Sequence, residues 1–159
     1  MVKLEKATFA AGCFWGVEEE FRKLPGVVST AAGYTGGKTA KPTYEDVCSD
    51  TTGHAEAVEI EFDPRQISFG KLLDIFFACH NPTMKNRQGP DVGTQYRSTI
   101  FFHGKGQEKI ARESMARLAK SGKWGSPIAT EIVPAGKFWK AEEYHQKYLL
   151  KRGQASCRI

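Results

Sequence analysis

One stretch near the start of the chain constrains the fold more than any other. A run of small apolar side chains over residues 7–11 predicts a buried strand, and Gly12 after it permits a tight turn. Beyond the turn, apolar residues recur at helical spacing: Phe14, Val17, Phe21 and Leu24. The sequence therefore predicts a strand, a tight turn and a helix in succession, and Cys13 falls in the turn.

Two interpretations of Cys13 follow from this position. The positive end of a helix stabilises a thiolate, which lowers the pKa of the thiol and makes the sulfur a nucleophile. The alternative is a small thiol that only packs, because unpaired cysteine is among the most buried residue types. Phe14 and Trp15 directly after the thiol favour a substrate pocket over packing alone.

A second segment, residues 54–63, predicts a strand with one buried face. Apolar side chains at positions 58, 60 and 62 alternate with glutamates at 59 and 61. Counting back by two places Glu56 and His54 on the apolar face. A buried Glu56 would have a raised pKa and, still protonated near neutral pH, would suit general-acid chemistry. If the strand begins after Glu56, this side chain meets solvent instead.

The order of the predicted elements indicates the fold class. Further helices are expected over residues 69–80, 104–122 and 138–151, and strands over 27–32, 98–103 and 127–133. The first six elements follow the ferredoxin-like βαββαβ order. We therefore predict an α+β fold, a two-layer α/β sandwich with a C-terminal helix-strand-helix. It forms one domain over residues 1–159, with a mobile tail over 152–159.

Composition restricts the function classes. The 159 residues are 40% hydrophobic and 26% charged, which is ordinary for one globular domain. No apolar run reaches about 18 residues, and the N-terminus lacks the apolar core of a signal peptide, so we expect a cytoplasmic protein with no membrane partner. The net charge of +5 is scattered among acidic residues, without runs of like charge, so we expect no nucleic-acid partner.

The four cysteines do not form a recognisable metal site or disulfide framework. They are Cys13, Cys48, Cys79 and Cys157. No C-x-x-C pair occurs, and the spacings between cysteines and histidines do not match zinc-ligand pairs. We therefore expect no metal and no cofactor, and the thiols are left for burial or redox chemistry.

Five short blocks together resemble a known family. They are GCFWG at residues 12–16, YEDVCS at 44–49, GHAE at 53–56, GTQYRS at 93–98 and YHQKYL at 144–149. In this order, and over nearly the whole chain, they resemble the peptide methionine sulfoxide reductases of type A. The resemblance implies thiol-dependent reduction of methionine S-sulfoxide, free or in proteins, and hence repair of oxidised proteins.

The resemblance also implies a role for each matching residue. Cys13 would attack the sulfoxide sulfur, while Phe14 and Trp15 hold the methyl group. The sulfoxide oxygen would be bound by three donors: Tyr44, Glu56 and Tyr96. Glu56 would protonate this oxygen, which is otherwise a poor leaving group, and Asp91 would help to position the site. Neutral hydrogen-bond donors suit the binding of a sulfoxide oxygen because they add no charge to the site.

The reaction would leave Cys13 as a sulfenic acid, which a second thiol must convert to a disulfide. Cys157 lies six residues past Lys151, a span of about 20 Å when extended, and family members often carry recycling cysteines in such a glycine-containing tail. Cys48 and Cys79 are the alternatives. A thioredoxin-like partner would then reduce the Cys13–Cys157 disulfide directly, and a tail that must move freely favours a monomer.

Two other function classes remain open at this point. A cysteine hydrolase would need His54 or His145 within hydrogen-bond reach of Cys13, and it would cleave an ester without any reductant. A basic nucleic-acid module would show salt-sensitive binding that survives Cys13→Ser.

Overall fold

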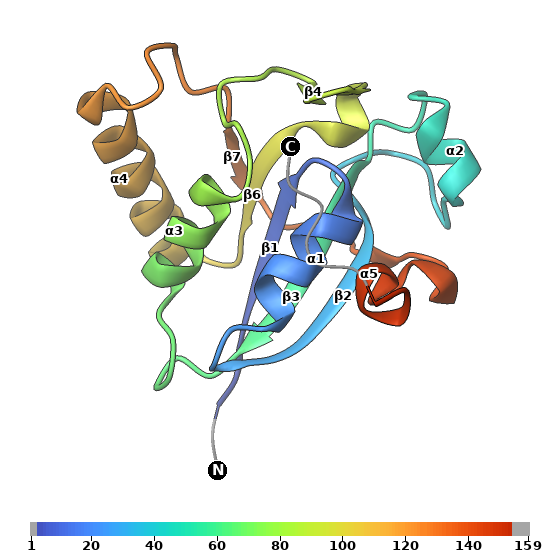
Figure 1. Ribbon diagram of the computed structural model, residues 1–159, viewed down its shortest axis with the longest axis horizontal. Helices are drawn as coiled ribbons and strands as arrows, with labels where there is room; N and C mark the ends of the chain where they lie inside the picture. The colour runs from blue at the N-terminus through green and yellow to red at the C-terminus, as the bar shows by residue number, and fades with distance from the viewer. Residues whose placement is uncertain (1–2, 154–159) are drawn as a thin grey trace.

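The computed structural model describes residues 3–153, and a six-stranded sheet forms its centre (Figure 1). The strand order is β7-β6-β1-β3-β2-β8, and neighbouring strands are antiparallel except β6 and β7, which are parallel. The strands of this sheet are β1 (Glu5–Ala11), β2 (Val27–Thr35), β3 (Ala55–Phe62), β6 (Ser98–Phe102), β7 (Glu131–Pro134) and β8 (Trp139–Lys140). A separate small hairpin pairs β4 (Arg87–Gln88) with β5 (Asp91–Val92).

Among the described residues, three helices pack against one face of the sheet, and two shorter ones lie beside it (Figure 1). The first three are α1 (Phe14–Arg22), α3 (Phe69–Ala78) and α4 (Lys105–Ser121), and the shorter two are α2 (Tyr44–Cys48) and α5 (Tyr148–Lys151), with 3-10 turns η1 (Thr94–Tyr96) and η2 (Glu143–His145). Figure 1 shows α1 across β3 and β2, and α3 and α4 side by side toward the β6–β7 edge. The predicted mixed α/β fold around a central sheet is confirmed. Within residues 3–153, no helix is both long and apolar enough to cross a membrane.

The main core lies between the sheet and α1, α3 and α4. Phe9 of β1 is its centre, because its ring lies 5.3 Å from Phe21, 5.9 Å from Phe69 and 5.1 Å from Phe76, measured between centroids. Burying each of these side chains stabilises the fold by about 1.5–3 kcal/mol relative to exposure. The core thus fixes α1, and with it the Cys13 turn, against the sheet.

The opposite face of the sheet is covered by the segment that leads into β8. Small side chains of β1 and β3 and the ring of Phe101 meet Val133, Ala135 and Phe138 there. A Cβ on Gly33 of β2 would lie 2.5 Å from Phe138 Cζ and 2.5 Å from the Trp139 carbonyl oxygen. This close approach therefore requires glycine at position 33.

The predicted helix over residues 138–151 is wrong for most of its length. The structure has β8, η2 and the short α5 there. Trp139 pairs with Tyr34 at the sheet edge, and the Ala141 N–H donates to the Ala32 carbonyl. Lys147 has a positive φ of 51°, which interrupts any helix. Sheet pairing and local backbone geometry thus override the helical spacing of the apolar residues.

Smaller differences concern the loops and the chain end. Residues 83–97, for which no element was predicted, contain β4, β5 and η1. The strand predicted over 27–32 continues to Thr35 as β2, and the chain then leads to α2. The capping box of Thr43 and Asp46 starts α2. The predicted strand over 127–133 is observed as β7. Residues 154–159, including Cys157, lie outside the described residues.

Candidate active site

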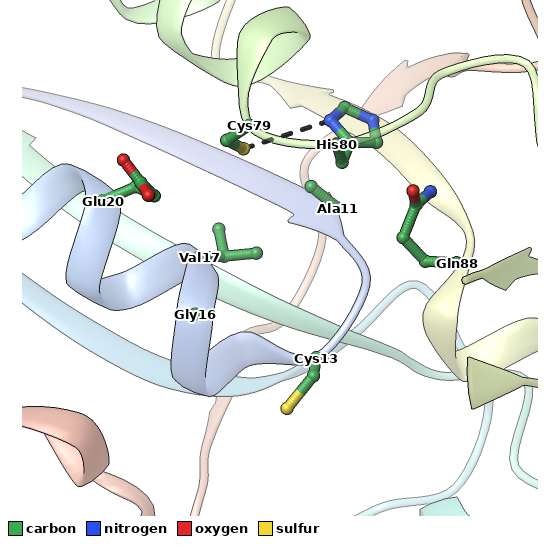
Figure 2. A pocket seen from close by; sticks show the side chains of 8 residues that line it. All are labelled: Ala11, Cys13, Gly16, Val17, Glu20, Cys79, His80 and Gln88. Carbon is green, nitrogen blue, oxygen red and sulfur yellow. Dashed lines mark hydrogen bonds between the residues drawn. The ribbon is translucent and has the colours of Figure 1, made fainter. Parts of the chain in front are cut away.

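Cys13 is the N-cap residue of α1, as the strand-turn-helix prediction requires. Gly12 before it has a φ of 96°, and a Cβ there would lie 2.9 Å from Gln88 Cγ, so the turn needs glycine. Cys13 is partly exposed, and its sulfur points away from Cys79 and His80 (Figure 2). This position places the sulfur beside the positive end of the α1 dipole.

The cavity beside this turn is too small for a substrate side chain. Its lining residues come from α1, from the end of α3 and from β4 (Figure 2): Ala11, Cys13, Gly16, Val17, Glu20, Cys79, His80 and Gln88. The cavity measures about 20 Å³, which is room for about one water molecule. A substrate side chain therefore needs space outside this cavity.

Glu56 lies at the start of α1. It is 1% exposed on the inner face of β3, as the alternation predicted. The backbone N–H of Phe14 donates to Glu56 Oε1 at 3.2 Å, while Oε2 is buried without a hydrogen-bond partner among residues 3–153. Burial raises the pKa of Glu56 to about 8, although the Phe14 N–H lowers it, and Asp91 adds to the rise. The carboxyl is therefore mostly protonated at neutral pH.

Tyr44, Tyr96 and Asp91 surround this carboxyl. Burial raises the pKa of Tyr44 and of Tyr96, and the negative charge of Glu56 contributes to both shifts. Asp91 in β5 acts on the pKa of Glu56 and of Tyr96. The two phenols thus stay protonated at neutral pH and can donate hydrogen bonds.

Aromatic rings form the rest of the site. Phe14 is fully buried, and its ring lies 5.7 Å from Tyr34. Trp15 is partly exposed and stacks on Tyr148 with 3.8 Å between centroids and 6° between planes. The Trp15 indole N–H donates to His145 Nδ1 at 2.8 Å. The predicted pair, Phe14 and Trp15, therefore belongs to a wider aromatic cluster.

Glu142 is a site residue that sequence reasoning missed. The Tyr34 hydroxyl donates to its Oε1 at 2.8 Å, and the Tyr44 N–H donates to its Oε2 at 2.9 Å. Burial raises the pKa of Glu142, but these donors outweigh it and the net pKa is lowered. The ionised carboxylate thus ties α2 to β2. The sequence did not indicate this role, because the spacing that predicted a helix over 138–151 gives no reason to place Glu142 beside Tyr44.

The histidines of the hydrolase hypothesis are engaged elsewhere. The Gly37 N–H donates to His54 Nδ1 at 3.0 Å, and His54 Nε2 lies 2.7 Å from the Thr39 carbonyl oxygen. His145 Nδ1 accepts the Trp15 indole N–H. A neutral imidazole has one acceptor nitrogen, and in both histidines another N–H occupies it. Neither is therefore poised to take a proton from Cys13.

Within residues 3–153, two further cysteines lie at helix ends. Cys48 is an exposed residue at the end of α2, where partial burial of its thiol raises its pKa and the Tyr44 hydroxyl lowers it. Cys79 is the C-cap residue of α3. Among residues 3–153, no three or more His, Cys, Asp or Glu side chains are grouped so that they could hold a metal ion.

A partly exposed thiol beside a buried carboxyl and a cluster of aromatic rings is the arrangement of a thiol-dependent enzyme on an α/β scaffold. The family model described as "Peptide methionine sulfoxide reductase" matches residues 5–159. A Geobacter sulfurreducens protein named peptide methionine sulfoxide reductase MsrA is 63% identical over 98% of this chain and 96% of its own length.

Two solved structures are similar as well. Reduced Mxr1 from Saccharomyces cerevisiae has a TM-score of 0.89 at 39% identity, over 98% of this chain and 90% of that one. Mxr1 in complex with Trx2 has a TM-score of 0.64 at 31% identity, over 92% and 85%. The chain therefore belongs to the peptide methionine sulfoxide reductase family, type A. It is an oxidoreductase that reduces methionine sulfoxide in a thiol-dependent reaction, and the resemblance of the five sequence blocks is confirmed.

Proposed function

We propose that Cys13 is the nucleophile and Glu56 the acid in the reduction of the S epimer of methionine sulfoxide. The observation that carries this proposal is the buried carboxyl of Glu56, which receives the Phe14 N–H at 3.2 Å and has a pKa raised by burial to about 8. A carboxylic acid beside Phe14, the residue after Cys13, can give its proton to the oxygen of a sulfoxide whose sulfur the Cys13 thiolate attacks.

The proposed step balances as a two-electron transfer. The Cys13 thiolate attacks the sulfoxide sulfur, and Glu56 gives its proton to the sulfoxide oxygen. Attack forms a bond between the Cys13 sulfur and the substrate sulfur. The hydroxyl made by protonation then passes to the Cys13 sulfur as this S–S bond breaks, and the electron pair of the bond stays on the substrate sulfur. The substrate is reduced to methionine, and Cys13 is oxidised to a sulfenic acid.

The neighbouring residues have supporting roles in this proposal. Tyr44 and Tyr96, whose pKa values are raised by burial, donate hydrogen bonds to the sulfoxide oxygen. Burial is the main cause of the raised pKa that keeps Glu56 protonated, and the charge of Asp91 adds to it. Phe14 and Trp15 hold the methyl group in an apolar pocket.

Cys157 is our proposed resolving thiol. The Arg152 guanidinium lies 4.3 Å from the Tyr148 ring, which stacks on Trp15, two residues after Cys13. The tail therefore starts close to Cys13, and the four residues that follow Gly153 and end at Cys157 can span about 14 Å. A thioredoxin-like protein would reduce the resulting disulfide, an assignment that the Mxr1–Trx2 complex supports. Cys48 and Cys79 remain the alternatives.

The same proposal includes the location of the protein, its oligomeric state and the type of its core. The chain acts as a cytoplasmic monomer with one domain over residues 1–159, repairs oxidised proteins and needs no cofactor besides the external thiol. It has no nucleic-acid or membrane partner. We also propose that its core is ferredoxin-like, because the order β6-β1-β3-β2 of the first four long strands is that of an antiparallel βαββαβ sheet.

Cys13→Ser tests the proposed function. The variant should lose reduction of N-acetyl-methionine S-sulfoxide with dithiothreitol, because an un-ionised hydroxyl is a far weaker nucleophile than a thiolate. Cys79→Ser, assayed with the same reductant, is the matched control and should retain activity. Activity of Cys13→Ser on the S epimer, or equal turnover of the R epimer by the unaltered protein, would contradict the proposal.

A further inference from the structure

We propose that His145 is a positioning residue that fixes the Trp15 indole as the wall of the methyl pocket. This inference rests on the proposed function, in which Trp15 contacts the substrate methyl group. The contact that carries it is the hydrogen bond from Trp15 Nε1–H to His145 Nδ1, at 2.8 Å. The two residues are 130 positions apart in the sequence.

The surroundings of His145 determine its protonation state. The residue is fully buried, and its ring packs against four aromatic rings: Phe14, Trp15, Tyr44 and Tyr144. Burial lowers the pKa of the imidazole, while the charge of Glu142 raises it by less. The ring is therefore neutral at pH 7, and since Nδ1 accepts the indole N–H, the proton resides on Nε2.

The other ring nitrogen of His145 makes a histidine at this position energetically costly. His145 Nε2 is buried and has no hydrogen-bond partner among residues 3–153. A buried N–H without an acceptor is costly, and phenylalanine would fill much the same space without that cost. The acceptor function of Nδ1 toward Trp15 is what offsets it.

Two contacts together define the orientation of the indole. Stacking on Tyr148, at 3.8 Å and 6°, fixes the plane of the Trp15 ring but permits rotation within this plane. The hydrogen bond to His145 holds one edge of the ring and removes that rotation. Both partners come from one short segment, residues 145–148, so their relative positions are fixed by the same turn.

This segment is itself tied to the scaffold on two sides. Gln146 Oε1 accepts the Ala32 N–H at 2.8 Å, and Gln146 Nε2 donates to the Ala32 carbonyl at 2.9 Å. The Lys147 N–H donates to Glu18 Oε1 at 2.7 Å. These bonds connect the segment to β2 and to α1, so His145 can transmit the rigidity of both elements to Trp15.

His145→Phe tests the inference, because it keeps an aromatic ring and removes the acceptor. For N-acetyl-methionine S-sulfoxide we expect KM to rise about tenfold, which corresponds to about 1.4 kcal/mol, with a smaller change in kcat. His145→Gln, which offers an amide oxygen as acceptor, should recover part of the loss. His103→Phe is the matched control and should leave both constants unchanged, since His103 bonds to Thr8.

A double-mutant cycle separates positioning from a general structural effect. In a Trp15→Phe background the indole N–H is absent, so His145→Phe should raise KM no further. An equal rise in both backgrounds, or an unchanged KM in the single variant, would overturn the inference. If His145→Phe does not fold, His145→Leu serves in the same cycle. The inference can fail while the unaltered protein stays active, whereas failure of the proposed function appears in the Cys13→Ser assay.

Discussion

Replacing Glu56 by Gln should make the protein more stable at neutral pH and much less active. Glutamine preserves the shape of the side chain and an oxygen for the Phe14 N–H, but it has no proton to transfer. Glu56 has a folded-state pKa of about 8 against an ordinary value of 4.5. Unfolding therefore releases a proton in the window between these values, and the stability of the unaltered protein falls as pH rises through it.

The magnitude follows from this shift. The quantity of interest is the free energy of unfolding of the variant minus that of the unaltered protein. At 1.36 kcal/mol per pKa unit, this difference should be larger at about pH 8 than at about pH 5.5, by about 3 kcal/mol. Loss of a general acid typically lowers the rate by about 10²–10⁴-fold. The buried carboxyl thus lowers stability in order to keep a proton in the site, and the two effects should appear in the same variant.

Two measurements check the prediction. Urea denaturation of both proteins at several pH values gives the free energies of unfolding, and single-turnover reduction of N-acetyl-methionine S-sulfoxide gives the rate. Glu59→Gln is the control, because Glu59 is on the same strand, is partly exposed and pairs with Lys6 at 3.7 Å. A stability difference between Glu56→Gln and the unaltered protein that does not change with pH would refute the argument, as would an unchanged rate.

Two further outcomes are expected. Cys157→Ser should reduce one equivalent of sulfoxide per enzyme and then stop with thioredoxin as reductant, which intact-protein mass spectrometry after one turnover can verify; continued turnover would assign the resolving role to Cys48 or Cys79. Gly33→Ala should lower the free energy of unfolding by about 1–3 kcal/mol, because its Cβ would meet Phe138 and the Trp139 carbonyl at 2.5 Å. Gly106→Ala in α4, where a Cβ meets nothing within 4 Å, is its control in urea denaturation and should not destabilise.

Local patterns were sufficient for the parts of the site that one element defines. The small-residue run, Gly12 and the helical spacing after it identified the turn that presents Cys13. Alternation in β3 indicated an inward Glu56 but left open a strand that begins after it, and the observed start of β3 at Ala55 decided between the two. Both depend on neighbours within a few residues, where the periods of strand and helix determine which way a side chain faces.

Only the tertiary structure decided which elements converge on these two residues. Glu56 meets the Phe14 N–H across 42 positions, Glu142 meets Tyr44 across 98, and His145 meets Trp15 across 130. No periodicity encodes such contacts, because they depend on how the strands pair. For the same reason the helix predicted over residues 138–151 is wrong: pairing of β8 with β2 decides the backbone there, and side chains that would line a helix instead anchor the aromatic cluster.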